Sequence, residues 1–130
     1  MCFVVDRDPQ DFSEEQLNNF IFECKKYGFD AYISNPAFEF FLLLHSDKVF
    51  EFDRNEMIRN ERQGAKRGKR FLEIKLSEIF GCSKTNLNFE KFKPNIRKAI
   101  KNEKEFCEEL EKLKSNLGSN VGQLLSSIME

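Results

Sequence analysis

The sequence predicts an α/β protein with a short parallel sheet and a mostly α-helical C-terminal half. An apolar run at residues 3–5 and the segment at residues 30–34 have the composition of strands, and the stretch between them has helical spacing. A strand–helix–strand unit of this kind gives a parallel, right-handed pair. The chain has 130 residues, 40% of them hydrophobic, which is enough for one domain with its own core. We therefore expect a single domain over residues 1–130, with a core at 1–46 and a helical extension at 47–130.

The first predicted strand ends in Asp6-Arg7-Asp8. Residues two apart in an extended strand point the same way, so both carboxylates can converge on one cation if the extended form persists through them. Mg²⁺ prefers carboxylate oxygens and usually takes one or two of them from a protein. Asp6 and Asp8 are therefore candidate ligands for a weakly bound Mg²⁺ or Mn²⁺. The alternative is that Asp8-Pro9 forms an ordinary turn after the strand.

A first helix is predicted between the two strands. Ser13 and Gln16 have the spacing of a capping box, and Phe12 before the cap can pack on Leu17. Gly28 is suited to the left-handed residue that ends a helix. The next strand is expected at residues 30–34.

An apolar helix is predicted after Pro36, with Ser34 or Asn35 as its cap. It is apolar on every side, which is typical of a helix buried all round. Glu39 lies within it and needs a partner or a shifted pKa, unless it only meets the helix dipole in the first turn. His45 ends this helix, where the helix C-terminus favours the charged imidazole.

The rest of the chain has mostly helical patterns. Asn120 and Gln123 resemble a second capping box, ahead of the last helix. The predicted helices cover residues 55–63, 69–80, 94–113 and 121–128.

Charge is unevenly distributed along the chain. Residues 1–23 contain six acids and one base, whereas residues 62–70 contain five bases and no acid. An acidic rim and a basic segment on one domain suit a metal ion together with a polyanion. The basic segment is thus a candidate contact for the phosphate backbone of DNA or RNA, unless it is only a solvated loop. No aromatic residue interleaves the bases, so base stacking is not indicated. The candidate residues are Arg62, Lys66, Arg67, Lys69 and Arg70.

Cysteine usage and hydropathy exclude other classes of protein. The cysteines at positions 2, 24, 82 and 107 form no Cys-x-x-Cys pair, and a single histidine makes a zinc site unfavourable. We expect all four thiols to be reduced and structural. The apolar run at residues 40–44 is too short to span a membrane, and the N-terminus lacks a signal-peptide layout, so a cytoplasmic location is expected.

Three motifs together resemble the RloB-like family, a bacterial Toprim-like group associated with restriction and phage-defence loci. They are Asp6-Arg7-Asp8, the segment from Asp30 to His45 with its Ser34-Asn35-Pro36-Ala37-Phe38-Glu39 centre, and the tail Ser119-Asn120-Val121. The resemblance covers nearly the whole chain. It implies a metal-dependent nuclease domain in which Asp6 and Asp8 hold Mg²⁺, with Glu39 and His45 as further candidate catalytic residues.

One feature departs from the Toprim pattern. Toprim domains place a glutamate after an earlier strand, and that acid works together with the Asp-x-Asp pair. Met1 stands five residues before Asp6, so no such strand precedes it in this sequence. We therefore expect a fragment or a shortened form that is inactive alone, with the acid supplied upstream or by another chain.

A non-catalytic interaction module is the second hypothesis. Without an upstream strand, the sheet edge at residues 3–5 should be exposed and able to pair with a partner strand or a second copy. A hydrolase of small nucleotides is a third and weaker option, because neither predicted strand is followed by a Gly-rich phosphate-binding loop.

Overall fold

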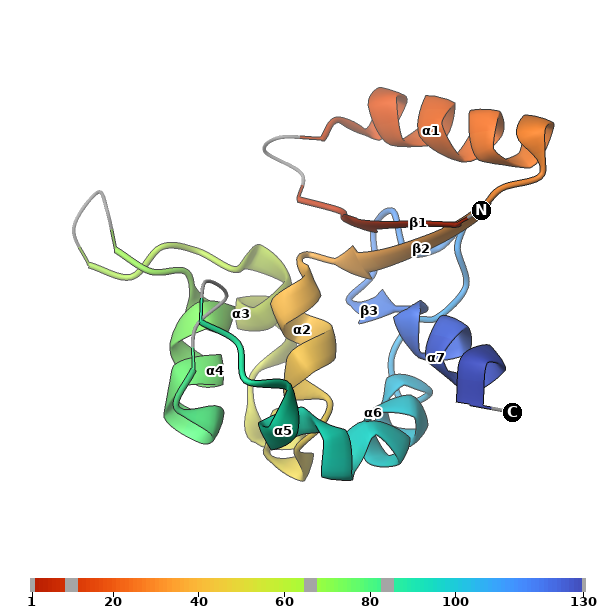
Figure 1. The fold of residues 1–130 in the computed structure, drawn as a ribbon. Coiled ribbons are helices and arrows are strands. Elements are labelled where there is room, and N and C mark those ends of the chain that lie inside the picture. The colour runs from red at the N-terminus through yellow and green to blue at the C-terminus, as the bar shows by residue number, and fades with distance from the viewer. Residues whose placement is uncertain (1, 9–11, 65–67, 83–85, 130) are drawn as a thin grey trace.

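The computed structural model describes residues 2–8, 12–64, 68–82 and 86–129. Its sheet has the order β1-β2-β3. Strand β1 (Cys2–Asp6) pairs in parallel with the central strand β2 (Asp30–Asn35), and the short β3 (Gly118–Ser119) runs antiparallel along the other edge of β2 (Figure 1). The predicted α/β class and its parallel strand pair are confirmed. The third strand comes from the C-terminal half and has no counterpart in the sequence prediction.

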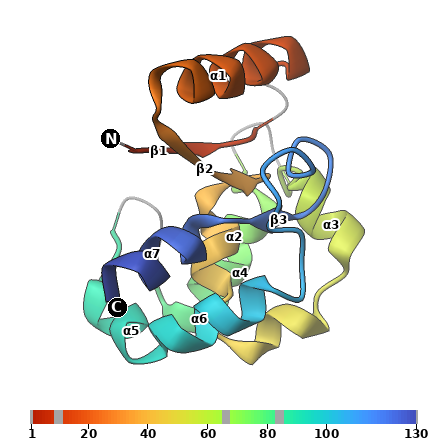
Figure 2. The ribbon, with the colours of Figure 1, turned by 90° about the vertical axis from the view of Figure 1, so that its right-hand side faces the viewer.

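Helix α1 (Glu14–Tyr27) connects the two parallel strands and lies on the opposite side of the sheet from the other described helices (Figure 2). The predicted capping box is present: the Gln16 N–H donates to Ser13 Oγ at 3.1 Å, and the Ser13 N–H donates to Gln16 Oε1 at 2.9 Å. Gly28, with a φ of 72°, ends the helix as predicted. The buried face of α1 packs Leu17 and Ile21 against Ile33 of β2.

Helix α2 (Phe38–Leu43) starts the larger core on the opposite side of the sheet (Figure 1). Phe40 and Leu43 are fully buried, as the apolar pattern predicts. The predicted cap was wrong, because the N-cap residue is Ala37. Ser34 and Asn35 instead belong to β2, where they pair with β3.

The remaining helices are short and surround α2. Helix α3 (Arg54–Arg59) ends at Asn60, whose φ is 46°, and so is shorter than the predicted helix, which extended to residue 63. Gly81, with a φ of 66°, ends α4 where the sequence indicates. Their bounds are η1 (Asp47–Glu51), α3 (Arg54–Arg59), α4 (Phe71–Phe80), α5 (Phe89–Phe92), η2 (Lys93–Asn95), α6 (Ile96–Glu103) and α7 (Val121–Met129).

The predicted helix over residues 94–113 was wrong beyond Glu103, where α6 ends. Phe106 packs on Phe40 in the core below the sheet, with ring centroids 5.0 Å apart. Leu113 is buried with Leu17 in the other core, against α1. The chain therefore crosses from one core to the other, which a continuous helix would not allow.

The predicted capping box at Asn120 and Gln123 was also wrong. The side chain of Asn120 is bound to β2: its Oδ1 accepts the Ile33 N–H at 2.7 Å, and its Nδ2 donates to the Ala31 carbonyl at 3.2 Å. Asn120 therefore extends the sheet by one residue beyond β3.

All four cysteines are free thiols, and Cys24 and Cys82 are buried. Cys107 does not lie on a helix, because it forms an isolated bridge with Gly118. Among the described residues, no helix has the length and apolar character needed to cross a membrane.

Candidate active site: a carboxylate cavity where the parallel strands end

A cavity of about 390 Å³ lies where β1 and β2 end. In open α/β sheets, ligands commonly bind beyond the carboxyl ends of the strands. Four segments of the chain line the cavity: the end of β1, the turn from β2 to α2, the end of α3 and the start of α4. Its charged lining residues are Asp6, Asp8, Glu39, Arg59, Arg70 and Glu73.

Asp6 is the last residue of β1. Its Oδ1 accepts the Phe38 N–H at 2.9 Å, so the carboxylate lies at the first turn of α2. A negative charge is favourable there, because the first backbone N–H groups of a helix lack intrahelical partners. Asp6 thus joins the strand to the apolar helix while lining the cavity.

Asp8 lies beyond the end of β1, and its φ is 21°. The extended form therefore does not persist through Asp8. The prediction that the Asp6 and Asp8 carboxylates point the same way required that it did. Two backbone hydrogen bonds hold Asp8 instead: its N–H donates to the Pro36 carbonyl at 2.9 Å, and its carbonyl accepts the Phe12 N–H at 2.9 Å. The predicted turn at Asp8-Pro9 extends outside the described residues. Both aspartates still line the same cavity.

Arg7, between the two aspartates, is buried. Its Nε donates to the Lys114 carbonyl at 2.9 Å, and its Nη1 donates to the Phe12 carbonyl. These bonds connect the strand end to both the following turn and the C-terminal half of the chain. Arg7 thereby fixes the backbone that carries the two carboxylates.

Glu39 lies in the first turn of α2, is buried, and lines the cavity with the aspartates. Its position in the first turn agrees with the dipole interpretation. The same position places Glu39 beside Asp6 and Asp8, where the family resemblance implies a catalytic site. The two interpretations of Glu39 are therefore compatible.

His45 lies outside the group of residues that line the cavity. It is buried, its Nδ1 lies 3.0 Å from the Leu42 carbonyl, and its ring packs against Phe41 and Phe92 at centroid distances of 5.4 and 5.2 Å. Burial lowers the pKa of His45, and this outweighs the backbone hydrogen bonds that raise it. The expected preference for the charged imidazole was wrong, because desolvation disfavours the charge.

The basic segment at residues 62–70, hereafter the basic arm, lies between α3 and α4, and its described ends, residues 62–64 and 68–70, lead away from these helices (Figure 1). Its two ends pair like a hairpin: Arg62 and Arg70 form an antiparallel bridge, and the Gln63 N–H donates to the Lys69 carbonyl at 3.0 Å. Arg70, the last residue of the arm, lines the cavity, so the arm ends beside the carboxylates. Two further predicted contacts, Lys66 and Arg67, lie outside the described residues.

A family model described as "RloB-like protein" matches residues 1–128. The chain belongs to the RloB-like family. Neither a curated protein nor a solved structure matches this RloB-like chain. The matched range includes the cavity, the basic arm and the C-terminal segment that completes the sheet.

The RloB-like chain places two charged residues in the cavity that sequence reasoning missed, Arg59 and Glu73. They lie in the last turn of α3 and the first turn of α4. Asn60 holds these two helix ends together, because its Oδ1 accepts the Leu72 N–H at 2.9 Å. In the sequence, an Asn at the end of a polar helix only weakly indicates that two helix ends meet there. It does not indicate that these helix ends line the cavity.

The carboxylates of the RloB-like cavity are chemically suited to a hard divalent cation. Within residues 2–8, 12–64, 68–82 and 86–129, no three His, Cys, Asp or Glu side chains are arranged to hold a metal ion. Mg²⁺ commonly takes one or two protein carboxylates and keeps several waters. Carboxylates match this ligand preference, and water would supply most of the coordination sphere of such an ion.

Proposed function

We propose that this RloB-like chain carries a Toprim-like, metal-dependent nuclease site that acts in bacterial phage defence. One observation supports the proposal best: a single cavity at the ends of the parallel strands gathers carboxylates together with two arginines. Carboxylates suit the metal ion of a phosphodiesterase, and arginines suit the phosphate of its substrate. The residues are Asp6, Asp8, Glu39, Arg59 and Arg70.

Each group has a distinct task in this proposal. Asp6 and Asp8 would hold Mg²⁺ or Mn²⁺, and such an ion when bound would supply a water of lowered pKa and positive charge near a leaving oxygen. Arg59 and Arg70 bind non-bridging phosphate oxygens, for which the planar guanidinium is well suited. Glu39 adds negative charge beside the aspartates and so strengthens the attraction for a cation.

The site has few protein ligands and is inactive or weak alone in this proposal. A further acidic residue, from an upstream segment or from another chain, completes it. This addition would raise metal affinity, because Mg²⁺ affinity rises with the number of carboxylates that contribute charge.

The test combines metal titration with a cleavage assay. Millimolar Mg²⁺ or Mn²⁺ should shift the NMR signals of Asp6 and Asp8, and Asp6→Asn or Asp8→Asn should remove the shifts and any metal-dependent cleavage of DNA or RNA. Asn retains the acceptor for the Phe38 N–H, so the fold should survive. Asp30→Asn, at the other end of β2, is the matched control. If neither metal perturbs the aspartates, the proposal is wrong.

A second candidate function, a non-catalytic interaction module, is supported by the edge position of β1. In the described sheet β1 has β2 as its one neighbour, and Phe3 and Val4 are 38% and 47% exposed. Unpaired edges can recruit another strand. In this alternative β1 pairs with β1 of a second copy, which is the simplest closed arrangement.

A further inference from the structure

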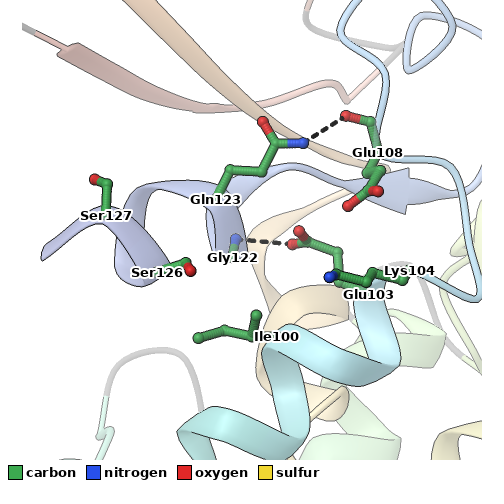
Figure 3. Close-up of a pocket in the computed structure, with 8 residues that line it drawn as sticks. All are labelled: Ile100, Glu103, Lys104, Glu108, Gly122, Gln123, Ser126 and Ser127. Atoms are coloured by element: carbon green, nitrogen blue, oxygen red, sulfur yellow. Dashed lines mark hydrogen bonds between the residues drawn. The ribbon is translucent and has the colours of Figure 1, made fainter. Parts of the chain in front are cut away.

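A groove between α6 and α7 lies apart from the carboxylate cavity, with which it shares no lining residue. It consists of a hollow of about 360 Å³, shown in Figure 3, and an adjoining hollow of about 320 Å³. Both hollows are lined by Ile100, Lys104 and Ser126, so they form one continuous feature, the α6–α7 groove.

The α6 wall of this groove is strongly basic. Residues 91–104, from the end of α5 to the residue that follows α6, contain six basic residues, all exposed, and one acid, which is buried. Arg97, Lys101 and Lys104 line the groove, and their spacing of four and three residues places them along one face of the helix end. Lys98 lies outside the groove lining and forms an ion pair with Asp47 at 3.3 Å.

The α7 wall is neutral and polar. Val121–Met129 contains no charged residue. Ser126 and Ser127 add hydroxyl groups to the lining, and Gln123 adds an amide that donates to the Glu108 carbonyl at 3.4 Å (Figure 3). The Ser127 hydroxyl donates to the Leu124 carbonyl at 2.9 Å, so it is the Ser126 hydroxyl that this wall offers to a ligand.

Two acids face the groove, Glu103 and Glu108. Glu103 is buried at its base, where its Oε2 accepts the Gly122 N–H at 2.9 Å (Figure 3). Burial raises the pKa of Glu103 to about 7, so near neutral pH the side chain carries only part of a negative charge. Glu108 lines only the hollow that Arg97 and Lys101 do not reach. The Arg97 end of the groove is therefore net positive.

We propose that the α6–α7 groove binds the phosphodiester backbone of a nucleic acid, as a second contact surface apart from the carboxylate cavity. The cations of the α6 wall contact phosphate oxygens, and the Ser126 hydroxyl donates to the same backbone. Such contacts are independent of base sequence. The choice of a nucleic acid as the ligand rests on the proposed function, whereas the polarity of the groove is independent of it.

Fluorescence anisotropy with a labelled DNA duplex and a labelled single-stranded RNA tests this proposal across a salt series. The triple variant Arg97→Ala, Lys101→Ala, Lys104→Ala should bind more weakly than wild type. Its slope of log K against log salt should be flatter by about 2.7 for the duplex and about 2.1 for the RNA, because each phosphate contact contributes about 0.9 or 0.7. The preferred nucleic acid is the one that wild type binds more tightly at the same salt concentration.

The control is a second triple variant with the same loss of charge, Lys26→Ala, Lys48→Ala, Lys112→Ala, whose residues are exposed and outside the groove. Its slope should stay closer to that of wild type. Ser126→Glu supplies an independent test, since it places a negative charge on the neutral wall and leaves all cations in place. It too should weaken binding, with thermal unfolding confirming that each variant is folded.

Three outcomes overturn the inference. Wild type does not bind nucleic acid at low salt, or the two triple variants have equal slopes, or the groove variant loses binding to anionic phospholipid vesicles while it keeps its binding to nucleic acid. Asp6→Asn separates this inference from the proposed function. If Asp6→Asn abolishes cleavage and the groove variant leaves nucleic-acid binding unchanged, only the inference fails. If no cleavage or metal binding is found but the groove variant loses binding, only the proposed nuclease fails.

Discussion

At the residue scale, Glu103 determines what its neighbours can be. A Cβ on Gly122 would lie 2.7 Å from Glu103 Oε1, so any larger residue there would require the buried carboxylate to move. Ser119 also hydrogen-bonds to Glu103, and Ser119 Oγ lies 3.2 Å from Ser34 Oγ. One polar network therefore joins α6, α7 and the paired strands β2 and β3.

Glu103→Gln should change how stability depends on pH. Burial raises the pKa of Glu103 from 4.5 to about 7, so the folded protein retains a proton that the unfolded chain releases. This favourable contribution is complete below pH 4.5 and is lost as pH rises to about 7, at a cost of roughly 3 kcal/mol. The variant should lose this dependence in urea unfolding at pH 5 and pH 8. The prediction would be wrong if the pH dependence of stability were unchanged in Glu103→Gln. It would also be wrong if Glu105→Gln, at an exposed position, lost the same dependence.

Gly122→Ala should destabilise the fold by about 1–3 kcal/mol, because the added methyl overlaps the buried carboxylate. The overlap is specific to Glu103, so the penalty should shrink when Gly122→Ala is made in a Glu103→Ala background. Urea unfolding of the four proteins of this double-mutant cycle provides the measurement. Equal penalties in both backgrounds would show that helix α7 rejects alanine for another reason.

At the element scale, the basic arm should act independently of the cavity chemistry. Replacing Lys66, Arg67 and Lys69 with Ala should flatten the salt dependence of duplex DNA binding by about 2.7 in slope, because three phosphate contacts are removed. Arg70 is left unchanged, since it lines the cavity. The triple variant of Lys26, Lys48 and Lys112 is again the charge-matched control. Absence of binding to both DNA and RNA at low salt would mean that the arm is only a solvated loop.

Strand β1 provides a second test at this scale. If two copies pair along this edge, sedimentation at micromolar protein should show a dimer that Val4→Lys abolishes, because a charge on an edge strand opposes pairing. Val4→Pro should act in the same way by removing a backbone donor. Phe22→Ser, an exposed change on α1, is the control. A monomer at all concentrations would exclude this route of association.

At the scale of the whole molecule, Asn120 connects the C-terminal segment to the sheet. Its side chain bonds the Ile33 N–H and the Ala31 carbonyl, and its own N–H donates to the Ile33 carbonyl at 3.2 Å. Asn120→Ala should cost about 2–4 kcal/mol, because two buried backbone groups lose their partners. Asn116→Ala, at an exposed position, should cost far less in the same chemical unfolding experiment. Similar losses for both would contradict this role.

The local elements could be predicted because their signals lie within a few residues of one another. The capping box of Ser13 and Gln16 and the end of α1 at Gly28 depend on hydrogen bonds and backbone preferences inside a single turn. The α/β class followed from two apolar strands around one amphipathic helix. The sequence also predicted the two acids at the end of the first strand, because the end of a strand is a local feature.

Tertiary structure decided how distant segments meet. Phe106 and Leu113 fit one helical pattern, yet they are buried in different cores, because spacing does not specify which core an apolar residue contacts. Asn120 resembled a helix cap until the backbone of β2 offered it partners eighty-seven and eighty-nine residues away. Arg59 and Glu73 reach the cavity only because α3 and α4 pack beside the end of β1. The sequence by itself determined the class of fold and the acids at the strand end, and long-range packing determined the composition of the site around them.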